Sequence, residues 1–260
     1  MDWLYTVSGF FVGFIVGITG VGGGSLMTPL LVLFFGVSPA TAVGTDLLYA
    51  ALTKMGGSYV HSKKGSVDWR VVKLLALGSL PAALISLWLL HTLSLDEKHL
   101  KSLITSVLSV ALILTSLSLF LKPWLQKLGR SDSEGIYELH AHHLVGATIL
   151  TGAVLGVLVT ISSVGAGALG AAVLLFLYPR HPTVRIVGTD IAHAVPLTLV
   201  AGLGHAALGT VNFSLLGSLL VGSLPGIWIG SHLSSRIPER ILRPILATML
   251  MIIGGKLLLA

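Results

Sequence analysis

The 260-residue chain contains no cysteine, and only 10% of its residues are charged. Without cysteine the chain has no thiolate metal site and no thiol catalysis. A soluble domain usually has about 25% charged residues, so the low charge argues against a water-soluble fold. No Gly-x-x-x-x-Gly-Lys-Ser/Thr phosphate loop is present, which argues against direct use of ATP.

Signs of catalysis are also missing from the sequence. There is no evident pairing of a nucleophile with a base, and the histidines and aspartates do not follow a metal-binding spacing. We therefore expect no enzyme activity, no cofactor and no metal ion.

Apolar residues are abundant instead. They make up 54% of the chain, and the mean hydropathy is +0.94. Long apolar runs extend from end to end, and the basic residues lie in short loops, where they set topology and do not suggest nucleic-acid binding. We expect a single transmembrane domain over residues 1–260 with the lipid bilayer as its partner. The N-terminal stretch has no basic region, so we interpret it as a retained membrane segment.

The chain is duplicated. Two segments recur identically at an offset of 144 positions: Val-Gly-Thr-Asp at 43–46 and 187–190, and Gly-Ser-Leu-Pro at 78–81 and 222–225. Two looser matches are 65–69 with 209–213 and 20–24 with 163–167. Two four-residue identities in one register are very unlikely by chance, so we expect two structural repeats, 1–122 and 143–260.

Both repeats have an apolar stretch, a break rich in small residues, a short apolar piece and three longer spans. In repeat 1 these segments are 3–19, 20–24, 25–36, 39–60, 69–91 and 100–121. In repeat 2 they are 143–162, 163–167, 168–178, 182–205, 213–235 and 240–259. A helix needs about 20 residues to cross the hydrocarbon, so the short pieces suggest broken, re-entrant hairpins. Residues 122–142 read as a loop, with a cytoplasmic linker at 123–142.

Loop charge distinguishes two topologies. If the broken pieces form hairpins, the repeats are inverted and twelve basic residues share one side: Lys63, Lys64, Arg70, Lys73, Lys122, Lys127, Arg130, Arg180, Arg185, Arg236, Arg240 and Arg243. Lys98, Lys101 and Lys256 then lie on the other side, whereas parallel repeats would divide the same fifteen residues eight to seven. Basic loops are cytoplasmic, so we expect inverted repeats with both termini extracytoplasmic. The predicted fold class is an all-α polytopic membrane protein, a plan that is typical of secondary transporters.

The two breaks are candidate binding sites. Glycine allows a turn inside the membrane, and a helix that starts there directs its free N–H groups and its dipole toward an anion. Together with the threonines of the repeated motif, the predicted substrate-binding residues are Gly22, Gly23, Gly24, Ser25, Thr45, Ser162, Ser163, Gly165, Gly167 and Thr189. Helix packing is the alternative, and we favour it for Gly9, Gly13 and Gly17, whose spacing is small-xxx-small.

Asp46 and Asp190 occupy the same depth in the two repeats. Intramembrane carboxylates mark ion paths, proton relays or buried partners, and we predict proton coupling through Asp46, Asp190 and His193. The alternatives are a hydrogen-bonded aspartate that braces the broken hairpin and a structural buried histidine. Thr45 and Thr189 have a second possible use, since threonine hydroxyls commonly bond back to helix carbonyls. Lys54 would attract an anion, pair with an acid or snorkel to the surface.

The Gly-Val-Gly-Gly-Gly segment at 20–24 with Pro29, followed by Ala-Val-Gly-Thr-Asp at 42–46, resembles the sulfite exporter TauE/SafE family of membrane permeases. The segments at 65–69 and 78–81 fit that family too. The resemblance implies transport of small sulfur-containing anions, such as sulfite or sulfoacetate, across the bacterial plasma membrane. The second break has Ser163 and Ala166 in place of two glycines, so the two half-sites are unequal.

The leading hypothesis is a secondary transporter, with export as the expected direction and proton coupling as a further hypothesis. The alternatives are a passive anion channel, an uptake permease for another small organic anion, and a structural subunit. The sequence leaves open whether the chain is a monomer or a homodimer.

Overall fold

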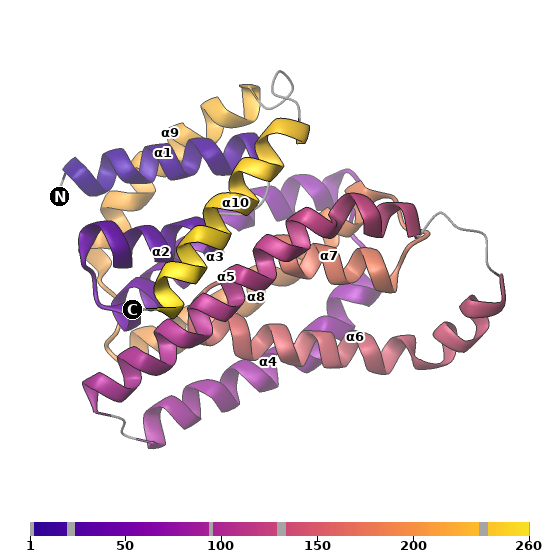
Figure 1. Ribbon diagram of the computed structural model, residues 1–260, viewed down its shortest axis with the longest axis horizontal. Helices are drawn as coiled ribbons and strands as arrows, with labels where there is room; N and C mark the ends of the chain where they lie inside the picture. The colour runs from indigo at the N-terminus through magenta and orange to yellow at the C-terminus, as the bar shows by residue number, and fades with distance from the viewer. Residues whose placement is uncertain (1–2, 20–23, 94–95, 129–133, 234–238, 260) are drawn as a thin grey trace.

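The computed structural model describes residues 3–19, 24–93, 96–128, 134–233 and 239–259. Every regular element within them is an α-helix, as predicted (Figure 1). The helices are α1 (Trp3–Thr19), α2 (Gly24–Phe35), α3 (Pro39–Lys63), α4 (Trp69–Thr92), α5 (Glu97–Leu128), α6 (Glu134–Ser162), α7 (Ala168–Leu177), α8 (Thr183–Ala207), α9 (Phe213–Leu233) and α10 (Glu239–Leu258).

Local sequence explains the borders of the central helices. Ser38 caps α3 by accepting the Thr41 N–H at 3.3 Å, and Pro39 fits the first helical position. Asp68 caps α4 by accepting the N–H groups of Arg70 and Val71 at 3.1 and 3.3 Å. The short helices α2 and α7 have 12 and 10 residues, so both predicted short pieces are confirmed as helices.

Among the residues that the structure describes, five helices are long and apolar enough to span a membrane, namely α4, α5, α6, α8 and α9. Helix α3 has the length but a more polar sequence, which includes Asp46 and Lys54, and it packs against α8 inside the molecule. The prediction of a loop at 122–142 is wrong for most of this range. Helix α5 continues to Leu128 and α6 begins at Glu134, since a polar segment outside the bilayer can still continue a helix.

Glycines bring helices of the two repeats into close contact. A Cβ on Gly9 or Gly13 of α1 would lie 2.5 Å from the carbonyl oxygen of Leu219 or Ser223 of α9. The packing interpretation of these two glycines is therefore confirmed. The equivalent pair α4–α6 has the same arrangement, in which Gly152 and Gly156 lie against backbone atoms of α4.

Reciprocal contacts join equivalent helices as well. The first turns of α3 face the end of α8, where Gly44 meets His205, and the first turns of α8 face the end of α3, where Gly188 meets His61. Helices α3 and α8 therefore run antiparallel. Helices α5 and α10 also run antiparallel. Ser116 Oγ donates to Ala247 O at 2.6 Å, whereas Gly254, later in α10, lies against Ser109, earlier in α5.

Candidate functional site

Charged side chains are buried in the middle of the α3–α8 pair. Asp46 and Lys54 come from α3, and Asp190 comes from α8. Their exposed fractions are 0%, 7% and 2%, and no other Asp, Glu, Lys or Arg is buried among the residues whose burial is described. Buried charges are costly unless they are paired, so this cluster is the strongest candidate for a site.

Asp46 is held by the short helix α2. The Thr28 hydroxyl, itself fully buried, donates to Asp46 Oδ2 at 2.6 Å. This bond matches the alternative in which the aspartate braces the broken hairpin. The Ser163 hydroxyl lies near the Asp46 carboxyl group, yet neither it nor Asp46 Oδ1 makes a regular hydrogen bond within the described part of the chain.

Asp190 lies against the first turn of α7. A Cβ on Gly170 would overlap Asp190 Oδ1, so only glycine leaves room for the carboxylate there. At the repeat offset of 143, the counterpart of Thr28 is Ala171, which has no hydroxyl. Asp190 Oδ1, like Asp46 Oδ1, has no hydrogen-bond partner among the described residues. The two half-sites are unequal because no hydroxyl equivalent to Thr28 stands beside Asp190.

Lys54 connects the two repeats. Its Nζ donates to the carbonyl oxygen of Ala166 at 2.7 Å, inside the second break. The ammonium also lies within electrostatic range of both carboxylates. Lys54 therefore does not snorkel to the surface, and that interpretation was wrong.

The second break has the conformation expected of a turn inside the membrane. Ser163, Gly165 and Gly167 have φ angles of 59°, 130° and 138°. Helix α7 then begins without a side-chain cap at Gly167, and its first backbone bond runs from Gly170 N to Gly165 O at 3.0 Å. The N–H groups of Ala168 and Leu169 precede that bond, so this helix end can receive an anion.

The predicted binding residues divide into three groups. Ser162 is used locally, since its hydroxyl donates to Leu158 O at 2.6 Å and accepts from Val164 N at 3.2 Å. Thr189 and Thr45 join the repeats, because they accept N–H bonds from Asp68 and Asn212 at 2.9 and 3.1 Å. Of the hydroxyls in the second break, only the one on Ser163 is buried and without a partner in the described structure.

The first break lies mostly outside the described residues. Gly22 and Gly23 fall in the undescribed segment, and Gly24 and Ser25 form the start of α2. The substrate role predicted for these four residues stays a prediction.

His193 is buried one turn beyond Asp190. Its Nε2 lies 2.8 Å from Ser79 Oγ, whereas its Nδ1 has no partner within the described chain. The bond to Ser79 supports the structural interpretation, and the free nitrogen leaves the predicted proton relay open.

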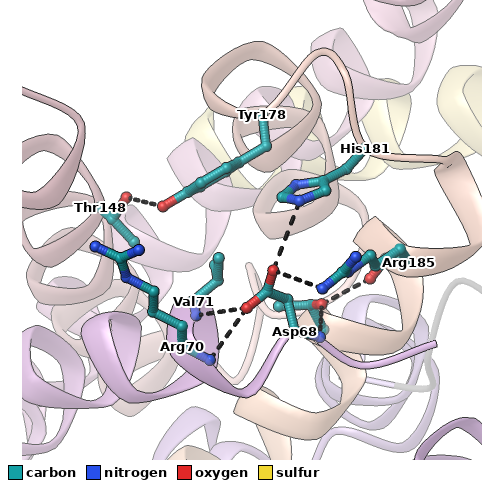
Figure 2. Close-up of polar contacts among 8 residues, drawn as sticks. Asp68, Arg70, Val71, Thr148, Tyr178, His181 and Arg185 are labelled. Carbon is teal, nitrogen blue, oxygen red and sulfur yellow. Dashed lines mark hydrogen bonds and ion pairs between the residues drawn. The ribbon is translucent and has the colours of Figure 1, made fainter. Parts of the chain in front are cut away.

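A second polar cluster was not predicted. Asp68, in the loop before α4, accepts a bond from Arg185 Nη2 at 3.1 Å and lies 3.6 Å from His181 Nε2 (Figure 2). Next to it the hydroxyls of Tyr178 and Thr148 are 2.7 Å apart. Burial and the nearby Arg185 lower the pKa of His181, and Asp68 only partly opposes this. A sequence signal existed, because the motif that contains Asp68 has Asn212 in repeat 2.

No group of three histidine, aspartate or glutamate side chains within the described ranges is arranged to hold a metal ion. The central site combines the Lys54 ammonium, two carboxylates, the hydroxyls of Thr28 and Ser163 and the N-terminus of α7.

Comparison with known proteins assigns the family. A family model described as "Sulfite exporter TauE/SafE" matches residues 5–257. The probable membrane transporter protein YjnA of Bacillus subtilis (strain 168) is 39% identical over 250 residues, which cover 96% of this chain and 97% of the relative. The probable membrane transporter proteins YdhB of the same organism and MJ0441 of Methanocaldococcus jannaschii are 26% identical over 237 residues and 24% identical over 271. The first alignment covers 90% of this chain and 91% of the relative, and the second covers 98% and 95%.

No solved structure matches the chain. With the family model spanning nearly all of it, the chain belongs to the TauE/SafE sulfite exporter family of multi-pass membrane transporters.

Proposed function

We propose that the chain is a secondary transporter that exports small sulfur-containing anions, such as sulfite or sulfoacetate, across the bacterial plasma membrane. The observation that carries this proposal is the position of Lys54. Its buried ammonium lies within electrostatic range of Asp46 and Asp190 and bonds to the broken segment before α7.

The anion would bind between Lys54, the Ser163 hydroxyl and the N-terminus of α7. A sulfonate or sulfite has several acceptor oxygens, which suit an ammonium, a hydroxyl and free N–H groups. Lys54 would leave the Ala166 carbonyl to meet the anion. This exchange is favourable, because a charged acceptor replaces a neutral one in a site of low dielectric.

Inverted repeats are part of the proposal. The antiparallel contacts of α3 with α8 and of α5 with α10 support it, since each pair consists of equivalent helices. In this arrangement the site lies at the repeat interface, and alternating access moves one repeat against the other. The excess of basic residues expected on one side supports an orientation with both termini outside the cell.

Charge balance argues for proton coupling. With both carboxylates ionised and Lys54 protonated, the cluster carries one negative charge. A bound monoanion would raise this to two, and a dianion such as sulfoacetate would raise it to three. Burying an unpaired charge costs several kcal/mol, so we infer that one carboxylate takes up a proton when the anion binds. The anion and the proton then move outward together when the product of their concentrations is higher inside the cell than outside.

Two alternatives use the same groups. A passive anion channel would also use Lys54 and a helix N-terminus, and an uptake permease for another small organic anion would differ only in direction. Flux that saturates at low rates would favour the carrier, whereas flux beyond transporter turnover would favour the channel.

The test is a panel of sulfite, thiosulfate, taurine, sulfoacetate and non-sulfur carboxylates, measured first as thermal-shift binding and then as flux in proteoliposomes. Saturable flux of sulfite or a sulfonate, with little flux of the carboxylates, supports the proposal. Equal flux of all anions would reject selectivity for sulfur oxyanions.

A further inference from the structure

A groove runs along the surface between α2 and α10 (Figure 1). Its volume is about 670 Å³, within the range of about 300–1,000 Å³ that is typical of ligand sites. The last turn of α2 forms one wall, and a stripe along α10 forms the other. The principal lining residues are Leu33, Phe34, Ile245, Met249, Ile252 and Lys256.

The apolar part of this groove is open to the surroundings. Phe34, Ile245 and Ile252 are 75%, 57% and 65% exposed, and in a multi-pass membrane protein such a surface faces hydrocarbon. From Ile245 to Lys256 the α10 wall rises about 16 Å, at about 1.5 Å per residue. This is close to half of a hydrocarbon core about 30 Å thick, which is one leaflet. The length of the groove therefore suits one acyl chain of a lipid.

One end of the groove carries a positive charge. Lys256 lies in the last turn of α10, its side chain is exposed, and it makes no ion pair within the described part of the chain. Among the described lining residues there is no aspartate or glutamate. Lysine side chains near the ends of membrane helices reach the headgroup level, where lipid phosphates can accept from them. An apolar groove with an ammonium at its end is complementary to an anionic lipid.

The equivalent place in repeat 2 is covered by the protein itself. Helices α7 and α5, the counterparts of α2 and α10, pack directly against each other, whereas α2 and α10 are in limited contact. At the offset of 143, the counterpart of Phe34 is Leu177, which is only 9% exposed. In repeat 1, by contrast, the end of α2 is left for another molecule to cover.

A second copy of this chain would leave Lys256 without a counter-charge. Two copies that meet through this face in a two-fold dimer bring the same residues, so the two grooves would contribute two lysines and no carboxylate. Unpaired charges inside a membrane are costly. An anionic phospholipid supplies both an acyl chain and a negative phosphate, so charge complementarity favours the lipid.

We propose that the groove between α2 and α10 binds one anionic phospholipid, with an acyl chain between the two helices and the phosphate on Lys256. The chain completes the packing of α2, as protein side chains do for α7 in repeat 2. The Lys256 ammonium donates to the phosphate oxygens. Lys256 lies outside the central site, so Lys256→Gln leaves sulfoacetate binding in lipid-free detergent unchanged.

The headgroup contact is tested by native mass spectrometry of the detergent-purified protein. Phosphatidylglycerol and phosphatidylcholine with identical acyl chains are added separately, and the bound lipid is counted. We expect one phosphatidylglycerol, bound about fivefold more tightly than phosphatidylcholine, which is the weight of one lysine beside an anionic lipid. Lys256→Gln removes this preference, and Lys256→Arg retains it. Lys101→Gln, an exposed lysine of α5 that does not line the groove, is the matched control and also retains it.

The acyl-chain contact is tested with a single introduced thiol, since the chain has no cysteine. Thr248 lines the groove and is exposed, so Thr248→Cys labelled with N-ethylmaleimide places a bulky group between the helices. We expect unlabelled Thr248→Cys to bind phosphatidylglycerol normally and the labelled protein to lose it. Leu84→Cys on α4, 57% exposed and outside the groove, is the control whose label has no effect.

Equal binding of phosphatidylglycerol by Lys256→Gln and Lys101→Gln would overturn the headgroup contact. Full binding by the labelled Thr248→Cys protein would overturn the groove as the site. A two-chain mass that the label at position 248 converts to one chain would show that a second copy occupies the groove instead. No transported anion enters these measurements, so their failure is distinct from failure of the transport function.

Discussion

The Lys54 ammonium of the first repeat donates to the Ala166 carbonyl of the second at 2.7 Å, and this bond crosses the interface at the broken helix. It fixes a positive charge beside the start of α7 with both buried aspartates in electrostatic range. A charge held on a neutral carbonyl is available for exchange, which is the basis of the transport mechanism proposed here.

Removing the Lys54 charge is expected to weaken anion binding strongly. Lys54→Gln eliminates the buried ammonium of the central site, and the loss of a charge-assisted bond of about 1.5–3 kcal/mol corresponds to roughly 10- to 150-fold weaker binding. Binding is measured by thermal shift with sulfoacetate. Lys256→Gln, on the exposed face of α10, is the control and retains native affinity. Equal affinity in both variants would exclude Lys54 from the site.

Thr28→Val tests the bond that braces α2. The substitution preserves shape but leaves Asp46 Oδ2 without its donor, and we expect a loss of about 1.5–3 kcal/mol in unfolding free energy. Thr28→Ser retains the hydroxyl and is expected to lose much less. The unfolding midpoints of Thr28→Val and Thr28→Ser are compared in detergent. Equal midpoints would contradict a stabilising role of the Thr28–Asp46 bond.

Gly170→Ala tests the close approach of Asp190 to α7. The added methyl group would overlap Asp190 Oδ1 and displace the carboxylate, so flux is expected to fall at least about tenfold, as when a catalytic geometry shifts by about 1 Å. Gly146→Ala on α6 is the matched control, because its new methyl group meets no atom within 4 Å. Normal flux in a folded Gly170→Ala protein would show that the position of Asp190 is not critical.

The pKa of His181 is lowered by burial and by Arg185, so the imidazole is neutral at pH 7.5. His181→Gln should then leave stability at pH 7.5 nearly unchanged. A histidine whose pKa is lowered on folding contributes stability that is present above the ordinary value of 6.5 and is lost as the pH falls below it. Between pH 6.5 and pH 5 the unmodified protein should therefore lose more stability than His181→Gln. Parallel curves of melting temperature against pH would contradict this.

Much of the architecture could be predicted because its signals are local. Glycine and serine mark the second break, and α6 ends at Ser162 as expected. A bracing role for Asp46 was among the alternatives, but its partner Thr28 could not be foreseen, because this bond depends on how α2 turns back against α3. The ion pair between Asp68 and Arg185 joins residues 117 positions apart, and only the exchange of Asp68 for Asn212 hinted at it.

The loop expected at 122–142 shows what a local sequence signal does not predict. Polarity indicated that the segment leaves the membrane, which says nothing of whether the backbone remains helical there. Helices α5 and α6 both extend into this segment, so hydropathy located the end of the apolar run and not the end of the helix.

The central claim is that the buried carboxylates bind a proton together with the anion. Anion flux and proton flux are measured together in proteoliposomes, with a pH-sensitive dye inside, for the unmodified protein and for the double variant Asp46→Asn, Asp190→Asn. Glu97→Gln, an exposed carboxylate at the start of α5, is the control. We predict that protons accompany sulfite or sulfoacetate in the unmodified protein and the control but not in the double variant, whose flux no longer depends on the pH gradient. Proton movement that persists in the double variant would contradict the claim.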